Sequence, residues 1–272
     1  MENNDTKDIK KTAERKKINI NGNMYTFVYS VVIVVIVAVL LTIAATALKP
    51  AQQRNIEIEK KENILKTVGK AEEAGTVQNK AQYIEDEYEK YIVESYVVDE
   101  SGNKIDGDAF ATELKVELAK PAGERRLPVF VYKNEEQIRY IIQLYGKGLW
   151  GPIWGYVAFE SDFNTIAGIA LDHEGETPGL GAEITTAQFQ KQFAGKQIFD
   201  GNNIVSITIQ KPGGVLNNHT VDGISGGTIT SKGVQDMIAG NLNVYRGFFD
   251  KMKSENGKND LTEIDEKNIS DE

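Results

Sequence analysis

The chain has 272 residues, of which 40% are apolar and 26% are charged, and these shares are typical of a folded protein rather than a disordered one. It carries 40 Asp and Glu against 31 Lys and Arg, a net charge of −9, which argues against a nucleic-acid-binding protein because such a protein needs a basic surface. Cysteine is absent and only two histidines are present, which excludes disulfides, thiolate ligands, cysteine nucleophiles and multi-histidine metal sites.

The first predicted element is an apolar segment without any charged residue, from Phe27 to Leu48. At about 1.5 Å per residue, a helix of this length crosses a hydrocarbon core roughly 30 Å thick. We therefore expect a transmembrane helix over residues 24–48, after an N-terminal tail of residues 1–23. A cleaved signal peptide is the alternative, because Ala45-Thr46-Ala47 resembles a cleavage site, but signal peptides have a shorter apolar region of about 7–15 residues.

The charges that flank this segment predict its orientation. Before it stand six Lys and Arg and four Asp and Glu, whereas Lys49 and Arg54 are the nearest cations after it. The positive-inside rule then keeps the tail in the cytoplasm and places the rest of the chain on the other side of the membrane. The exported part is acidic, with 25 Lys and Arg against 36 Asp and Glu.

The exported part is predicted to fold as an α+β domain with an antiparallel sheet and flanking helices, over residues 49–250. Apolar residues recur at helical spacing over residues 53–68 and 81–92. Short apolar runs around polar turns then indicate strands and hairpins. These runs are Tyr96–Val98 before a turn at 101–103, Pro128–Tyr132 and Arg139–Leu144 around a turn at 133–136, and Tyr156–Phe159 and Ile166–Leu171 around a turn at 162–164.

The last third of the domain is predicted to contain a short helix over residues 189–194 and a strand over residues 204–209. Ser231 resembles the N-cap of a final amphipathic helix. The tail of residues 251–272 is polar and acidic, and we expect it to be disordered. The apolar face of the final helix comprises Val234, Met237, Ile238, Leu242, Tyr245, Phe248 and Phe249.

Glycine is concentrated in three segments, at 146–155, 175–181 and 223–227. Because glycine permits positive φ and close approach to a ligand, three such loops suggest a bound planar or phosphorylated group. Composition alone favours the other interpretation, three tight turns of a β-rich protein.

The third glycine segment runs directly into the final predicted helix. The N-terminus of a helix has unpaired N–H groups and a partial positive charge, so a phosphate held there is stabilised. Thr228 offers a hydroxyl that can form a phosphoester. The spacing permits this chemistry without establishing it, since many helix starts rich in Ser and Thr are only caps.

The segment Asp222-Gly-Ile-Ser225-Gly226-Gly227-Thr228 resembles the Asp-x-x-Ser/Thr-Gly-Ala-Thr motif of the covalent FMN-binding domain family. The segment His173 to Gly181 resembles the second signature of that family. Three further segments, Arg54-Asn55, Asn63-Ile64-Leu65 and Gly146 to Trp150, resemble the C subunits of Na⁺-translocating NADH:quinone reductases. The resemblance extends from about Met24 to Phe249. The G-type subunit of the ferredoxin:NAD⁺ reductase complex shares both signatures and the anchor.

The resemblance implies a cofactor and its attachment site. In the family the last threonine of the motif carries FMN through its phosphate, so Thr228 is the implied covalent site. Gly227 stands where the family usually has Ala. A separate flavin transferase makes the bond from FAD with Mg²⁺, so the metal belongs to that enzyme and we expect none here.

The resemblance also implies roles for neighbouring residues, with no catalytic residue beyond the flavin. The backbone amides from Ser225 to Thr228, through Gly226 and Gly227, are expected to hold the phosphate. Asp222 is expected to serve in recognition by the transferase or to brace the turn. The remaining cofactor-binding candidates are Glu176, Thr177, Gly179 and Leu180 against the flavin and Gly148, Leu149 and Trp150 along the pocket.

For three side chains the sequence also permits a structural interpretation. Trp150 and Trp154 fit a core or a membrane interface equally well. His173, beside Glu174, fits a hydrogen-bonded turn better than a catalytic base.

The implied function is that of an electron-transfer subunit in the bacterial inner membrane, with one span and its main domain periplasmic. Electrons would enter from an iron centre in neighbouring membrane proteins of the complex and leave to a second covalent FMN on the B subunit. The implied partners are the B, D and E subunits, the flavin transferase and membrane lipid, and no nucleic acid. Two alternatives remain: the G-type subunit, and an anchored extracytoplasmic binding protein without a redox role.

Overall fold

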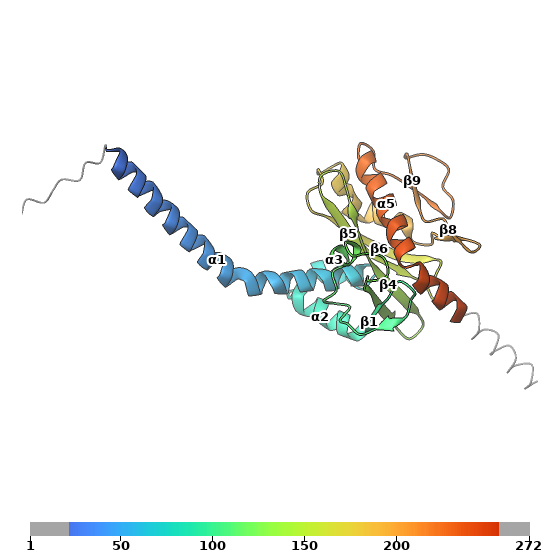
Figure 1. Ribbon diagram of the computed structural model, residues 1–272. Helices are drawn as coiled ribbons and strands as arrows, with labels where there is room; N and C mark the ends of the chain where they lie inside the picture. The colour runs from blue at the N-terminus through green and yellow to red at the C-terminus, as the bar shows by residue number, and fades with distance from the viewer. Residues whose placement is uncertain (1–21, 256–272) are drawn as a thin grey trace, which may run out of the picture. The chain divides into compact units, whose positions relative to one another are not determined.

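The structure, a computed structural model, describes residues 22–255 (Figure 1). The chain divides into two compact units, and the boundary in the sequence falls between Asn55 and Ile56. The predicted cytoplasmic tail lies outside the described residues except for its last two positions. Of the predicted acidic tail, residues 256–272 lie outside them as well.

The first element is one long helix, α1 (Asn23–Lys66), which includes both the predicted span and the helix predicted to follow it. Its most apolar window has a mean hydropathy of 3.1, and none of that window is buried. By length and composition it is sufficient to cross a membrane. Pro50 lies inside this helix, where it removes one backbone donor and favours a kink.

The second unit contains a six-stranded sheet in the order β2-β1-β3-β4-β5-β6, in which every neighbouring pair is antiparallel. The two predicted hairpins are present as β3–β4 and β5–β6, and the hairpin β4–β5 joins them. The strands are β1 (Ile92–Val98), β2 (Lys104–Ile105), β3 (Leu127–Lys133), β4 (Ile138–Lys147), β5 (Pro152–Phe159) and β6 (Ile166–His173).

Both faces of this sheet are buried, because successive side chains of a strand point to opposite faces. Val129 and Ile142 belong to the apolar cluster on one face, and their chain neighbours Phe130 and Ile141 belong to the cluster on the other. This burial on both sides explains why the central strands read as continuous apolar runs rather than alternating ones.

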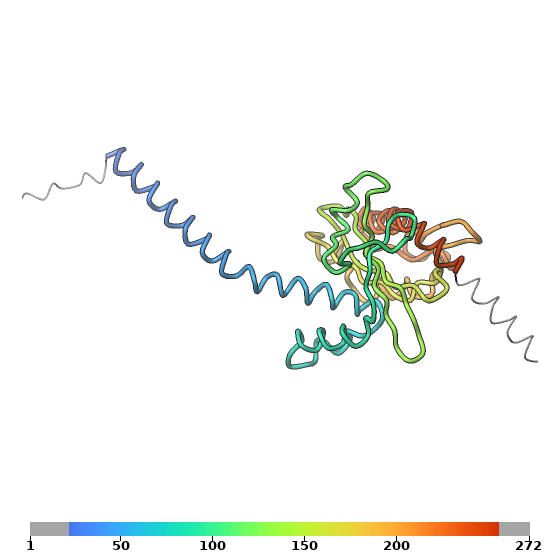
Figure 2. The backbone as a smooth tube through the Cα atoms, turned by 60° about the horizontal axis from the view of Figure 1, so that its bottom comes forward, coloured from blue at the N-terminus to red at the C-terminus, as the bar shows by residue number. Residues whose placement is uncertain are grey.

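One face is covered by helix α5 (Thr228–Val244) and the residues that follow it, and all seven side chains predicted for the apolar face of the final helix are buried. The opposite face packs against Ile64 of α1 and Val68 just after that helix, and α2 (Lys80–Tyr91) runs beside the last turns of α1 (Figure 2). An ion pair of 2.7 Å between Lys80 Nζ and Glu62 Oε2 joins these two helices.

Short elements complete the unit, and two of them differ from the predictions. The strand predicted over 204–209 is wrong, because Ser206 has a φ of 59° and divides the segment into two separate strands. The helix predicted over 189–194 is present, but it begins at Ala187 and ends as a 3₁₀ turn. The short elements are η1 (Glu72–Gly75), α3 (Leu114–Leu118), η2 (Gly181–Thr185), α4 (Ala187–Gln190), η3 (Lys191–Phe193), β7 (Phe199–Asp200), β8 (Asn203–Ile204), β9 (Thr208–Gln210) and β10 (Thr220–Asp222).

The chain continues beyond α5 as a second helical stretch over residues 246–255. It carries Phe248 and Phe249 into the core. The helix includes residues 251–255, so the position predicted for the start of the disordered tail falls within it.

Close contact between α5 and β4 depends on Gly146. A Cβ atom there would lie 2.6 Å from Met237 Cβ of α5, and Asn241 Nδ2 of the same helix donates to the Tyr145 carbonyl at 2.9 Å. We expect Gly146→Val to lower the free energy of unfolding of the full chain by about 1–3 kcal/mol, because the helix must move away from the strand. Thermal and denaturant unfolding in detergent would measure this.

Gly240→Ala is the control, since it replaces a glycine of α5 at a position where the added methyl group does not contact β4. Gly240 is exposed and a Cβ there would meet nothing within 4 Å. It should stabilise the helix by up to about 1 kcal/mol. Equal destabilisation by both variants would contradict the proposed role of the close contact.

Candidate functional site

The three glycine-rich segments meet at one cavity of about 360 Å³, although they are far apart in the sequence. The hairpin loop after β4, the loop after β6 and the start of α5 each contribute to its wall. Such convergence is typical of a ligand site and is not required of ordinary tight turns. The cavity is lined by Leu149, Trp150, Glu176, Thr177, Leu180, Gly181, Gly226, Gly227, Thr228, Ile229 and Thr230.

Helix α5 begins at Thr228, with Gly227 as its N-cap, and the prediction of Ser231 as N-cap is therefore wrong. Ser231 lies in the first turn, where its N–H donates to the Gly227 carbonyl at 2.8 Å and its Oγ accepts from Ile224 N at 3.0 Å. The hydroxyl thus folds the preceding loop back onto the helix instead of capping it. No side chain caps this helix start.

The start of α5 presents free hydrogen-bonding groups to the cavity. The backbone N–H groups of Thr228, Ile229 and Thr230 have no acceptor among residues 22–255, as expected for the first turn of an uncapped helix. The Thr228 side chain is exposed, and its hydroxyl has no hydrogen-bond partner in the described part of the chain. The free N–H groups can bind an anion at the start of α5, and the Thr228 hydroxyl beside them is available as a nucleophile.

Two glycines before the helix bring the loop close to Leu180. Gly226 has a φ of 76°, and a Cβ there would lie 2.7 Å from Leu180 Cδ2. Gly227 has a φ of −103°, which any residue adopts, although a methyl group would lie 2.9 Å from Ile224 Cγ2. An alanine at Gly227 therefore requires Ile224 to move, and its Cβ would also lie 3.3 Å from the backbone of Leu180.

The rim of the cavity carries exposed apolar side chains. Trp150 is 69% exposed, Ile229 60%, Leu149 44% and Leu180 42%. This exposure answers the open question about Trp150, which is not a core residue. Trp154 is half-buried and lies on a different cavity, beside α1. A rim of this kind favours a ligand with a broad apolar face.

Glu176 lies at the base of the cavity and is only 5% exposed. Its Oε1 accepts from Trp150 N at 2.9 Å, and its Oε2 accepts from the Thr230 hydroxyl at 2.6 Å. Burial opposes ionisation, but the Thr230 hydroxyl and the amides of Trp150 and Leu149 outweigh it and hold the pKa of Glu176 below its usual range. The sequence analysis placed Glu176 against the flavin, and nothing in the sequence indicated that its carboxylate is buried and bound by the protein itself.

Four of the predicted site residues do not line the cavity. Gly148 leaves room for the Glu176 carboxylate, and Gly179 has a φ of 74° and donates its N–H to Glu183 Oε1 at 3.1 Å. Ser225 is exposed to solvent and is not among the residues that line the cavity. Asp222 is held through its backbone, which exchanges two hydrogen bonds with the Gln192 side chain. Its buried Oδ1 accepts no hydrogen bond within residues 22–255, so the carboxylate does not brace the turn through that atom.

The sequence analysis missed three lining residues, Gly181, Ile229 and Thr230. The last two follow Thr228 directly, and the first turn of a helix that binds an anion was the signal that could have identified them. Gly181 ends the second signature, and its missing side chain leaves room for both Glu176 and Thr230.

His173 occupies a structural position, as predicted. Its Nδ1 accepts from Glu176 N at 3.2 Å, which closes the turn after β6. Among the described residues, no group of three or more His, Asp or Glu side chains is arranged to hold a metal ion.

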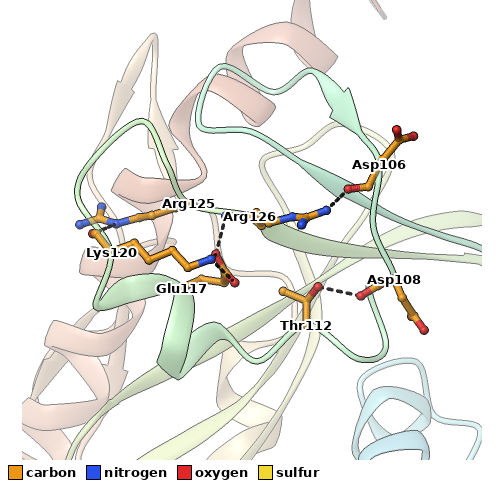
Figure 3. Close-up of polar contacts among 7 residues, drawn as sticks. All are labelled: Asp106, Asp108, Thr112, Glu117, Lys120, Arg125 and Arg126. Carbon is orange, nitrogen blue, oxygen red and sulfur yellow. Dashed lines mark hydrogen bonds and ion pairs between the residues drawn. The ribbon is translucent and has the colours of Figure 1, made fainter.

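Other cavities in the described part of the chain contain none of the predicted site residues. One of them, about 520 Å³, lies between the end of α1, β6 and α4. Another, about 380 Å³, lies beside α3, where Glu117 is bound by Lys120 Nζ at 2.7 Å and by Arg126 N at 3.0 Å (Figure 3). In the same cluster the Thr112 hydroxyl donates to the Asp108 carbonyl at 2.7 Å, and Arg126 Nη2 donates to the Asp106 carbonyl. The buried Arg126 Nε has no hydrogen-bond partner among residues 22–255.

Comparison with known proteins points to the same region. Residues 148–243 match the family model described as the FMN-binding domain, and this range includes every residue that lines the cavity. The C subunit of the Na⁺-translocating NADH-quinone reductase of Haemophilus ducreyi is 34% identical over 236 residues, 82% of this chain and 90% of that protein. The corresponding protein of Neisseria meningitidis serogroup B is 31% identical over 252 residues, 88% of this chain and 98% of the relative.

Two solved structures resemble the chain. The crystal structure of the C subunit of the same reductase from Parabacteroides distasonis has a TM-score of 0.66 and 42% identity, and the match covers 74% of this chain and 96% of that one. The crystal structure of NqrC from Shewanella oneidensis has a TM-score of 0.60 and 27% identity, with 72% and 99% covered.

Proposed function

Because the chain belongs to the family formed by the C subunits of Na⁺-translocating NADH-quinone reductases, we propose that it binds FMN and passes electrons between redox centres of that complex. The observation that carries this proposal is the convergence of three glycine-rich segments and an uncapped helix start on one cavity. FMN supplies reversible uptake and release of electrons when bound, while the residues of this chain hold it and restrict its contact with water.

The proposed attachment is a phosphoester between Thr228 Oγ and the phosphate of riboflavin. The exposed hydroxyl, which has no partner among the described residues, and the N–H groups of the first turn of α5 support it. With FAD as donor, the Oγ–P bond forms, the bond between that phosphorus and AMP breaks, and the hydroxyl proton leaves with AMP. A flavin transferase with Mg²⁺ would perform this step, so Thr228 needs no general base of its own.

The rest of the cavity then has clear tasks. The N–H groups of Thr228, Ile229 and Thr230 would bind phosphate oxygens. The apolar side chains of Leu149 and Leu180 would contact the flavin ring and exclude water from it. Trp150 and Ile229 would extend this apolar surface at the rim, and the exposed Thr177 would supply a polar contact.

The remainder of the proposal concerns the membrane and the partners. Residues 24–48 would anchor the chain in the bacterial inner membrane, and residues 49–250 would form the periplasmic FMN-binding domain. A covalent bond suits that location, because lost cofactor could not be replaced from the cytoplasm. The relatives described above favour the C-type over the G-type assignment. The B, D and E subunits of the complex would be its partners.

The function is tested by producing the full chain in bacterial membranes with and without a flavin transferase. We expect the peptide that contains residues 223–228 to gain the mass of one FMN less one water only when the transferase is present. The denatured polypeptide should then retain flavin fluorescence. An unmodified peptide beside an active transferase would refute the covalent assignment and leave the anchored binding protein without a redox role as the alternative.

A further inference from the structure

A buried carboxylate joins the three segments that form the cavity. Glu176 belongs to the loop after β6, and its Oε1 binds Trp150 N of the hairpin loop after β4 at 2.9 Å. Its Oε2 binds the hydroxyl of Thr230, in the first turn of α5, at 2.6 Å. Each carboxylate oxygen therefore fixes a different wall of the same cavity.

The surrounding backbone leaves space for this carboxylate. A Cβ atom at Gly148 would overlap Glu176 Oε1, and one at Gly181 would overlap both Glu176 Oε2 and the Thr230 hydroxyl. Both glycines have φ values outside the positive region, so their backbone conformation does not require glycine. The Glu176 carboxylate occupies the space that a side chain at either glycine would need.

The carboxylate carries its charge without a salt bridge. No Lys or Arg among residues 22–255 forms an ion pair with Glu176, and its charge is stabilised first by the Thr230 hydroxyl and backbone amides and then by His173 of β6. These hydrogen bonds outweigh the effect of burial and keep its pKa below the usual range of a glutamate. A fixed negative charge consequently lies at the base of the cavity at neutral pH.

We propose that Glu176 is a positioning residue that holds the cavity walls around FMN, and that its negative charge lowers the reduction potential of that FMN. The proposal rests on the proposed function. Two electrons and one proton convert oxidised FMN to its anionic reduced form, and the negative charge added to the ring is disfavoured beside a fixed anion. Because Thr230 is two residues from Thr228, the same carboxylate also fixes the turn to which the cofactor would be attached.

The test compares Glu176→Gln with the wild-type full chain, both produced with the flavin transferase. Glutamine keeps the size and hydrogen-bonding capacity of the side chain and removes its charge. In a dithionite titration we expect the ratio of reduced to oxidised flavin at a fixed potential to rise about tenfold, which is about 30 mV for a two-electron couple. Glu176→Asp keeps the charge and should stay close to the wild-type potential.

Glu183→Gln is the matched control, since Glu183 also accepts a backbone N–H, that of Gly179, but does not line the cavity. Its flavin potential should equal that of the wild type. Equal potentials for Glu176→Gln and the wild type, with flavin attached to both, would overturn the proposal while leaving the proposed function intact. Absence of flavin from the wild-type chain would overturn both.

Unfolding of the chain produced without the transferase supplies a second measurement. The folded pKa of Glu176 is lowered, so its ionised form stabilises the fold above the usual glutamate range, and this stabilisation disappears as the pH falls through the lowered pKa. The difference in unfolding temperature between wild type and Glu176→Gln should therefore shrink on acidification. A difference independent of pH would contradict the charged state on which the proposal depends.

Thr230→Val takes the place of Glu176→Gln if that variant fails to fold. Removal of the hydroxyl that donates to Oε2 raises the pKa of Glu176, so the flavin potential should rise above that of the wild type at mildly acidic pH. An unchanged potential in Thr230→Val across the acidic range would overturn the proposal.

Discussion

Thr228→Ala should abolish covalent flavin completely while leaving the fold intact. The Thr228 side chain is exposed and makes no hydrogen bond within residues 22–255, so its loss removes a nucleophile and no contact that stabilises the domain. Mass spectrometry of the chain produced with the transferase should show only the unmodified peptide. The unfolding temperature should match that of the wild-type chain without flavin.

Two other threonine variants make this prediction specific. Thr228→Ser keeps a hydroxyl at the same position and should retain attached flavin. Thr177→Ala removes an exposed hydroxyl from another wall of the same cavity and should also retain it. Flavin on the Thr228→Ala polypeptide, or its loss from Thr177→Ala alone, would contradict the assignment of Thr228.

Phe249→Ala should produce the largest loss of stability. Phe249 is fully buried, with ring centroids 5.0 Å from Phe159, 5.6 Å from Phe248 and 6.2 Å from Phe199. Truncation would remove these contacts and leave a cavity, at a cost of about 3–5 kcal/mol in the free energy of unfolding. Denaturant unfolding of the full chain in detergent would measure it.

Val215→Ala is the control for this substitution, because Val215 is 89% exposed. Its free energy of unfolding should lie within about 0.5 kcal/mol of the wild type. A similar small change for Phe249→Ala would show that residues 246–255 do not belong to the cooperative core of the domain.

Local periodicity accounts for what could be predicted of the fold. The charge-free run from Phe27 to Leu48 predicts its own helix, because nothing else satisfies the backbone of so long an apolar segment in a membrane. The hairpins and the apolar face of α5 were predicted from spacing within single elements and are confirmed.

The errors arose where a local rule competes with a tertiary contact. Ser231 has the chemistry of an N-cap, but its hydroxyl binds Ile224 N and the helix begins at Thr228. The apolar pattern over 204–209 is typical of a strand, but Ser206 takes a positive φ while its N–H bonds to the Ile198 carbonyl. Neither partner is visible in the periodicity of the segment itself.

By itself the sequence determined the long apolar helix, the antiparallel sheet, the motif around Thr228 and hence the family, because each depends on residues that are neighbours in the chain. Only the tertiary structure decided which of the glycine segments share one cavity, and that Glu176 is a buried link between them rather than a group free to face a ligand. The physical reason is that the partners of this carboxylate, Trp150 N and the Thr230 hydroxyl, come from separate segments that meet only when the sheet and α5 pack together.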